Sequence, residues 1–399
     1  MAKIMSTPTS DRLFGHPVTA ALRTTRPFAM SVFGLRLPVV LFALVFSHAN
    51  ACAQTAGTLP DYVPLLPQVK AKALVVDPQK GYAVKELKPD IYMITEGAYE
   101  SVFVTTGKGV VLFDAPPSFA RHIVQAVTET TREPIVELVY SHIHVDHIGG
   151  AGLVLHQVPK LEILAENGTA EFLREMQDPN RPVPTHTFKD HYTLKVGSLT
   201  ADLTLGHWHT PEGDLIISIP DKKFVMAIDA FSAGASPFMG LDLTMNMHEY
   251  LKFFDQLSAM DWDVMVPGHH STPATRGDLQ IAKDYVTDVY NTVTRLLAEN
   301  HQALRAQAAA KYGNNSWAIA SVIINSEVDQ CAKEIENRWI EKLEGVDIWA
   351  PSHCRTALVY AEWDVGPRKP LPVARTKTPN RFRQEAGLSV QAATSPPSR

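Results

Sequence analysis

Hydrophobic positions along the chain fall into short runs separated by glycines and longer amphipathic stretches with few breakers. Short β-branched or aromatic runs predict strands, in a first set at 91–95, 102–106, 109–113 and 135–140 and a second at 200–205, 215–219, 224–228 and 263–266. Helical periodicity predicts helices over 118–131, 248–260, 277–300 and 328–343. No repeat of fixed period is visible, which excludes solenoids and propellers.

The N-terminal segment has the pattern of an export signal. Arginines precede an apolar run over 37–46, which is too short to span a bilayer as a helix, and small residues follow it. We expect cleavage after Ala53, with a lipoprotein cut before Cys52 as a less favoured alternative. Met30 is an alternative start to Met1, and both give the same mature chain. The sequence therefore predicts a periplasmic or secreted protein whose mature chain has no stable membrane span.

Changes in pattern along the chain predict five parts. They are a signal peptide over 1–53, an N-terminal lead over 54–84, a central domain of strands and helices over 85–275, a C-terminal helical region over 276–365 and a disordered basic tail over 366–399.

Composition and charge narrow the class of protein. The 399 residues are 45% hydrophobic, enough for a packed core, and the formal charge of −5 offers no electrostatic footprint for nucleic acid. Three cysteines are too few for a disulfide scaffold. Export into an oxidising compartment leaves two possibilities for Cys331 and Cys354, a disulfide or two separate buried thiols.

The placement of the histidines is the feature of the sequence that indicates metal binding. The segment from Ser141 to Gly150 reads SHIHVDHIGG and directly follows a predicted strand. Side chains at i and i+2 of an extended segment point the same way, so His142 and His144 can bind one metal. Asp146 and His147 can turn toward a second. Four candidate ligands within six residues indicate a metal site rather than a solvated loop.

This HxHxDH run resembles the metal-binding signature of the metallo-β-lactamase-fold hydrolases, and further motifs from about residue 91 to 270 follow in that family's order. The resemblance makes Asp114 a support of the metal loop through hydrogen bonds. It makes His209 a ligand, with His207 an unlikely substitute. It makes Asp229 the carboxylate that bridges two metals, and His269 the last ligand.

The fold that the resemblance implies is α+β, a four-layer αββα sandwich with two mixed sheets, to which this chain adds C-terminal helices. The implied site holds two Zn²⁺ ions per chain, although iron or manganese suits the same donors. The ligands are His142, His144 and His209 for one metal, Asp146, His147 and His269 for the other, and Asp229 between them.

The implied activity is hydrolysis of an ester, lactone or amide by a metal-bound hydroxide, with Asp146 as the catalytic residue that orients it. The substrate is a small molecule, and the sequence does not determine the oligomeric state. Three alternatives stay open: a class B-like β-lactamase, a mononuclear-iron persulfide dioxygenase and a non-catalytic metal-binding protein. The β-lactamases typically carry Cys or Ser where Asp229 stands, which disfavours the first.

A segment rich in Gly, Met and aromatic residues follows Asp229, and it suggests an adaptable apolar wall beside the metals. Packing within the inter-sheet core is the alternative for the same residues. A wall would favour a hydrophobic substrate over a charged phosphodiester. The candidate substrate contacts are Trp208, Phe231, Phe238 and Met239.

Overall fold

The computed structural model describes residues 59–366. The predicted signal peptide, Cys52 and nearly all of the basic tail lie outside the described residues. Residues from Asp61 onward belong to one compact unit, and the elements below all lie in it.

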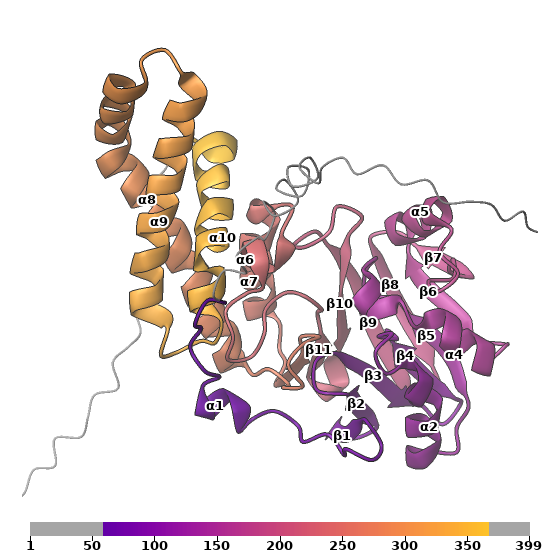
Figure 1. Cartoon of the computed structure of the whole chain (residues 1–399). Coiled ribbons are helices and arrows are strands. Elements are labelled where there is room, and N and C mark those ends of the chain that lie inside the picture. Colours follow the sequence, from indigo (N-terminus) through magenta and orange to yellow (C-terminus); the bar gives the residue numbers. More distant parts are fainter. Residues whose placement is uncertain (1–58, 367–399) are drawn as a thin grey trace, which may run out of the picture. The chain divides into compact units, whose positions relative to one another are not determined.

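The first half of this unit forms a seven-stranded sheet in the order β1-β2-β3-β4-β5-β6-β7 (Figure 1). Strands β1 to β4 pair antiparallel, and β4 to β7 pair parallel, so the sheet is mixed. The strands are β1 (Ala83–Lys88), β2 (Ile91–Thr95), β3 (Glu100–Thr105), β4 (Val110–Phe113), β5 (Ile135–Val139), β6 (Glu162–Glu166) and β7 (His186–Phe188).

The second sheet has five strands in the order β12-β11-β10-β9-β8. It is antiparallel except for the parallel pair of β11 and β12. The strands are β8 (His191–Val196), β9 (Leu199–Gly206), β10 (Asp214–Ile219), β11 (Phe224–Met226) and β12 (Val264–Val266).

The two sheets face each other across a shared apolar core. Alternate side chains of a strand point to opposite faces of its sheet, so Ile91 and Met93 of β2 meet Leu215 and Ile217 of β10 in the inter-sheet core. Ile216, between the last two, points to the opposite face, where the C-terminal helices pack. Both faces of the central strands such as β4 and β10 are therefore buried, which explains why those strands are mostly apolar.

Helices cover both outer faces. The outer face of the first sheet packs against α2 (Ala120–Thr130), α4 (Ala151–Gln157) and α5 (Asn167–Met176). The outer face of the second sheet packs against α7 (Met247–Ala259) and α8 (Arg276–Tyr312). The result is the four-layer αββα sandwich that the sequence predicted.

Three C-terminal elements extend the last layer: α9 (Ser316–Trp339), α10 (Val346–Val359) and a π-helical turn (Tyr360–Val365). A capping box starts α8, in which Thr275 and Asp278 each accept a hydrogen bond from the other's backbone N–H. A disulfide joins Cys331 of α9 to Cys354 of α10, with the Cα atoms 6.0 Å apart. Of the two possibilities for these cysteines, the structure has the disulfide.

Several elements differ from the sequence prediction. The helix expected over 277–300 runs to Tyr312, the one expected over 328–343 begins at Ser316, and α10 was not predicted. The edge strand β8 was missed because its residues are mostly polar and solvent-exposed, so the apolar signal is weak. Strands β1, β6 and β7 were missed as well. No helix among the described residues combines the length and the apolar character that crossing a membrane requires.

Candidate metal centre

The SHIHVDHIGG segment forms the loop between β5 and α4. His142 and His144 lie in its extended part, and a short helix, α3 (Val145–Ile148), carries Asp146 and His147. The two glycines are required by close packing, since neither has a positive φ. A Cβ on Gly150 would lie 2.2 Å from the Cβ of Ala120. The metal loop is thereby pressed onto α2.

Four side chains converge at the first position in the cluster: His142, His144, His209 and Asp229. Asp229 Oδ2 lies 3.3 Å from His142 Nε2 and 3.3 Å from His209 Nε2. His144 Nδ1 lies 2.8 Å from His209 Nε2. Ligands about 2.1 Å from a tetrahedral zinc lie about 3.4 Å from each other. The donor atoms are thus spaced as one ion would require.

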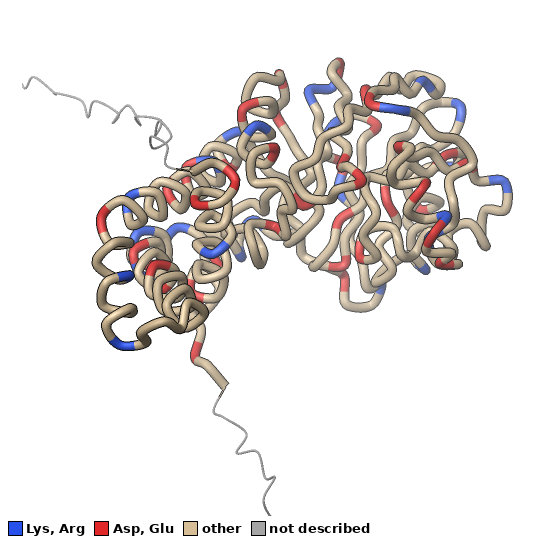
Figure 2. Tube along the Cα trace, turned by 90° about the horizontal axis from the view of Figure 1, so that it is seen from above, with Lys and Arg blue, Asp and Glu red and all other residues tan. Residues whose placement is uncertain are grey.

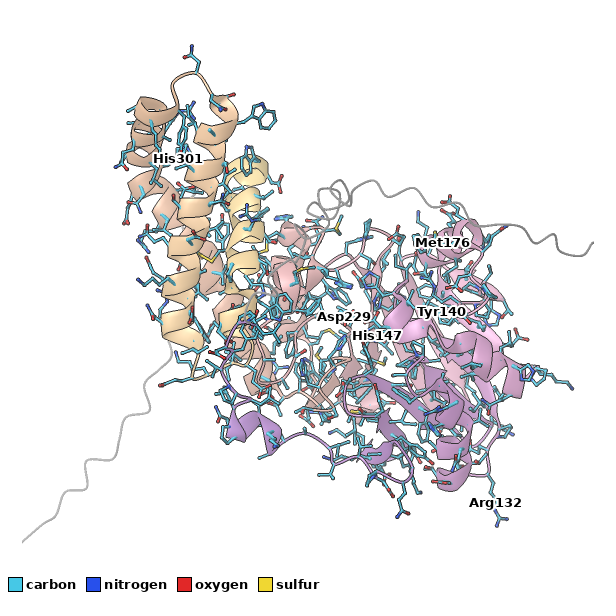
Figure 3. All side chains as sticks on the ribbon, in the orientation of Figure 1. Arg132, Tyr140, His147, Met176, Asp229 and His301 are labelled. Carbon is cyan, nitrogen blue, oxygen red and sulfur yellow. A yellow bond between two sulfur atoms is a disulfide. The ribbon has the colours of Figure 1, made fainter. Side chains whose placement is uncertain are left out.

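The second position brings together Asp146, His147, Asp229 and His269. Here Asp229 contributes its other oxygen, Oδ1, which lies 3.1 Å from His147 Nε2 and 2.9 Å from His269 Nε2. Asp146 Oδ2 is 3.6 Å from His147 Nε2. One carboxylate therefore faces both groups, one oxygen toward each. In Figure 3 the labelled Asp229 and His147 lie near one another, while the labelled His301 lies far from them on α8.

Orphaned polar atoms test whether the cluster suits a metal. His142 Nε2 and Asp229 Oδ1 are buried and make no hydrogen bond. Leaving such atoms without a partner costs free energy, and a cation in each ligand group would satisfy one of them. Imidazole and carboxylate are also the donors that zinc takes in proteins. The residues fit a bound metal.

The two aspartates at strand ends adopt left-handed backbone conformations. Asp114 follows β4 with φ of 64°, and Asp229 follows β11 with φ of 53°. This region is uncommon for residues with a Cβ, although Asp tolerates it better than most. Asp114 Oδ1 accepts a hydrogen bond of 2.8 Å from the backbone N–H of Ser141, immediately before His142. Asp114 therefore supports the metal loop from behind and is not among the cluster's ligand groups.

Two more buried carboxylates hold the backbone beside cluster histidines, and the sequence analysis missed both. Asp214 Oδ2 accepts a hydrogen bond of 3.0 Å from the N–H of His209. Glu100 Oε2 accepts one of 2.9 Å from the N–H of Gly268, directly before His269. Asp214 could have been noticed, because it closes the His-Thr-Pro-Glu-Gly-Asp turn that contains a predicted ligand. Glu100 is 168 residues from its partner and had no local signal.

The ring of His209 is oriented by a backbone carbonyl. Its Nδ1 hydrogen-bonds the carbonyl oxygen of Asp242. A carbonyl oxygen only accepts, so Nδ1 carries a proton and Nε2 is the ring nitrogen that faces the cluster. Asp242 lies in α6 (Met239–Leu243), which contains a left-handed turn, with φ between 55° and 65° from Gly240 to Asp242.

Burial and charge act in opposite directions on the acids here. Burial raises the pKa of Glu100 to about 8, and those of Asp114 and Asp214 to about 6. Burial also acts to raise the pKa of Asp229. The facing imidazoles, His147 first among them, outweigh it and hold the pKa of Asp229 well below its usual range. The central carboxylate is therefore ionised and able to bind cations.

A cavity of about 600 Å³ opens directly onto the cluster. Asp146, His144, His209, Asp229 and His269 form its floor. Tyr99 stands at its side, with its ring centroid 5.0 Å from that of His269. His270 also lines it, while His207 is exposed and is not among its lining residues.

The four candidate substrate contacts fall in different places. Phe238 lines the cavity and is 51% exposed. Trp208 and Phe231 are buried in the core against the C-terminal helices and do not reach the cavity. Trp208 instead packs on Phe253 and donates to the carbonyl of Ile228. Met239 is partly exposed but does not line the cavity. For Trp208 and Phe231 the expectation of substrate contact is therefore corrected to core packing.

Comparison with known proteins agrees with this geometry. Residues 94–269, less than half of the chain, match the family model described as the metallo-beta-lactamase superfamily. The matched segment contains all seven clustered residues. The cluster accordingly lies in the part of the chain that resembles this superfamily, and its His and Asp groups could hold metal ions.

The individual proteins to which the chain is similar have low sequence identity to it. The alpha subunit of 2,4-dinitroanisole O-demethylase from Nocardioides sp. (strain JS1661) is 26% identical over 187 residues, which cover 45% of this chain and 55% of that protein. A metallo-beta-lactamase from Pontibacter korlensis has a TM-score of 0.42 at 17% identity, covering 51% of this chain and 97% of its own. The metallo-beta-lactamase IND-7 has a TM-score of 0.40 at 19% identity, with coverages of 47% and 90%.

Proposed function

We propose that the protein is a dinuclear metal-dependent hydrolase that cleaves an ester, lactone or amide bond of a hydrophobic substrate. The observation that carries the proposal is Asp229, whose two oxygens face two separate groups of ligands. One group is completed by His142, His144 and His209, the other by Asp146, His147 and His269. Zinc is the metal we expect, with iron or manganese as alternatives.

Two bound dications would supply Lewis acidity and lower the pKa of a coordinated water. The chain's own residues would hold the metal ligands in position and orient the reacting water. The ring of His209 is held in place by the carbonyl of Asp242, and the buried acids Asp214 and Glu100 hold the backbone beside two ligands. Asp146 lines the cavity and its side chain is 40% exposed. Its carboxylate is placed to orient the attacking water and to carry the proton to the leaving group.

Metal content and turnover test the proposal together. The purified protein is expected to contain about two metal ions per chain. It should also hydrolyse at least one member of a panel of aryl esters, lactones, aryl amides and thioesters. His144→Ala should lower both the metal content and the hydrolysis. His156→Ala, an exposed histidine on α4 outside the cluster, is the matched control and should change neither. Wild-type protein without metal, or turnover that survives His144→Ala, would overturn the proposal.

The alternatives predict different results in the same experiment. A class B-like β-lactamase would hydrolyse a β-lactam reporter as fast as aryl esters. A persulfide dioxygenase would carry one iron and consume oxygen, whereas two complete ligand groups favour two metals. A non-catalytic metal-binding protein would bind metal without turning over any substrate. The O-demethylase relative adds an aryl methyl ether to the panel as a second candidate substrate.

We also propose that the protein is exported and acts in the periplasm or outside the cell. The Cys331–Cys354 disulfide supports this location, since such bonds persist in oxidising compartments. Mass spectrometry of the mature protein should find Gln54 as the first residue. A lipidated Cys52 would favour the lipoprotein alternative, and an intact Met1 or Met30 in the cytoplasm would contradict export.

A further inference from the structure

Beyond the metals, the cavity continues into an arm built by three segments that lie far apart in the sequence. The segments are residues 63–66 before the sandwich, the stretch from Phe238 to Leu243, and the corner between α9 and α10 over 340–349. The first and third lie outside the part of the chain that matches the superfamily. We call these three segments the apolar arm.

Hydrogen bonds attach the α9–α10 corner to the loop that follows Asp229. The N–H of Glu344 donates to the carbonyl of Gly234, and the N–H of Ser236 donates to the carbonyl of Glu344, at 3.0 and 2.9 Å. His353 Nε2 donates to the carbonyl of Phe238 at 2.9 Å. The N–H of Val63 donates to Asp347 at 2.7 Å. The arm is therefore a built wall of the cavity and not an accidental gap between segments.

The surface of the arm is apolar although it is accessible. Val63 is 50% exposed, Leu65 67%, Phe238 51% and Ile348 36%, and all four line the cavity. Large apolar side chains gathered in one concave, accessible place mark a binding site more often than a chance feature. The ring of Trp349 packs edge-on against Phe238, with centroids 4.7 Å apart.

The charged residues around the arm indicate which kind of substrate group it can bind. Among the described residues, no Lys or Arg lines the cavity, and the acids of the arm are Asp242, Glu344 and Asp347. Basic residues lie elsewhere, interspersed with acids along the surface elements (Figure 2). An anionic group placed in the arm would meet carboxylates and no cation to pair with, whereas a neutral ring would be covered by apolar side chains.

We infer that the apolar arm is the specificity subsite of the enzyme and binds a neutral aromatic group of the substrate, next to the bond that is cleaved. This inference rests on the proposed function for the identity of the reaction. The Phe238–Trp349 pair supplies an aromatic surface, since aromatic rings prefer offset or edge-to-face partners. Specificity is thus set by the lead segment and the C-terminal helices, while the superfamily domain supplies the metals.

Two measurements on the full-length metal-loaded protein test the inference. The first compares kcat/KM for 2-naphthyl acetate with that for ethyl acetate, which has no ring for the arm. The second measures equilibrium binding of 2-acetylnaphthalene, a neutral ketone that cannot be hydrolysed. Trp349→Ala and Ile348→Lys should each reduce the naphthyl ester's kcat/KM and the ketone's affinity about 10-fold. The ratio of the naphthyl ester's kcat/KM to that of ethyl acetate should therefore fall.

Matched variants separate a local effect from general damage. Trp349→Phe should restore most of the ketone's affinity, because a ring remains opposite Phe238. Trp317→Ala removes a tryptophan that is 86% exposed on α9 and does not line the cavity, and it should change nothing. Ile348→Lys guards against a folding defect in Trp349→Ala, since Ile348 is 36% exposed.

The outcomes for the two proposals can be distinguished. Hydrolysis of 2-naphthyl acetate that is unchanged by both arm variants would overturn the inference and leave the hydrolase standing. Ketone binding that both arm variants weaken, in a protein that turns over no panel member, would support the subsite and overturn the hydrolase. No binding of the ketone to the wild type would overturn the inference directly.

Discussion

The metal end and the apolar arm of the cavity are built in opposite ways. At the metal end, polar side chains come from strand-end loops of one domain, and buried carboxylates such as Glu100 and Asp214 hold the neighbouring backbone. The arm comes from distant segments that meet through backbone hydrogen bonds and a disulfide-linked helix pair. The metal end therefore has many interactions that specify a single geometry, whereas the arm mainly provides apolar shape. Substitutions at the metal end should abolish activity, and substitutions in the apolar arm should alter which substrates are preferred.

Asp229→Asn should produce the largest effect, because it removes the charged carboxylate that faces both ligand groups. We expect metal content to fall from about two ions per chain to one or none. Hydrolysis should fall by more than the roughly 10- to 100-fold that losing a ligand's hydrogen-bond partner costs. Metal analysis and steady-state kinetics measure both, with the exposed Asp221→Asn as control. Two tightly held metals in Asp229→Asn would contradict a bridging role.

Removing the disulfide tests the arm end without touching a ligand. Cys331 and Cys354 are separated by 23 residues, and both are fully buried. Closing a loop of this length restricts the unfolded chain, so the double variant Cys331→Ala, Cys354→Ala should lose about 3 kcal/mol of unfolding free energy. Urea denaturation measures the loss. The folded double variant should keep its metals but bind 2-acetylnaphthalene less tightly. Loss of metal instead would show that the two ends are not independent.

Glu100 tests whether the missed carboxylates position the ligands. Glu100→Ala leaves the N–H of Gly268 without its acceptor, so affinity for the metal at the Asp146, His147, His269 position should fall about 10- to 100-fold. Glu100→Gln keeps an acceptor oxygen at the same place and should lose much less. Competitive metal titration against a chelator compares the two. Equal losses in both variants would contradict a positioning role for this hydrogen bond.

His353 offers a pH-dependent test of the arm. It is fully buried, its Nδ1 accepts from the hydroxyl of Tyr285, and burial lowers its pKa to about 4. The imidazole of His353 binds a proton near pH 6.5 in the unfolded chain and near pH 4 in the folded one. The folded state therefore loses stability relative to the unfolded state as the pH falls below 6.5. Between pH 6.5 and 5 the loss should be about 1.5 kcal/mol. Denaturation at both pH values should show a smaller drop in His353→Gln. An equal drop in both proteins would assign it to other groups.

Sequence reasoning found the strands that carry the site and the cluster at their ends. Strands such as β2 and β10 are buried on both faces, so their residues are strongly apolar and stand out. Short or solvent-exposed strands such as β7 and β8 lack that contrast and were missed. Glu100 was missed for a different reason, because its partner lies in a loop that only the folded chain brings near.

The sequence by itself determined the ligand chemistry of this candidate metal site. Ligand spacing in the HxHxDH run is a local property of the backbone, because side chains two positions apart in an extended segment point to the same side. The tertiary structure decided what surrounds that chemistry. Trp208 and Phe231 entered the core, while Trp349, which no motif marked, came to stand beside Phe238. A cavity wall depends on which distant segments pack together, and apolar side chains carry no local sign of whether they will face a core or a ligand.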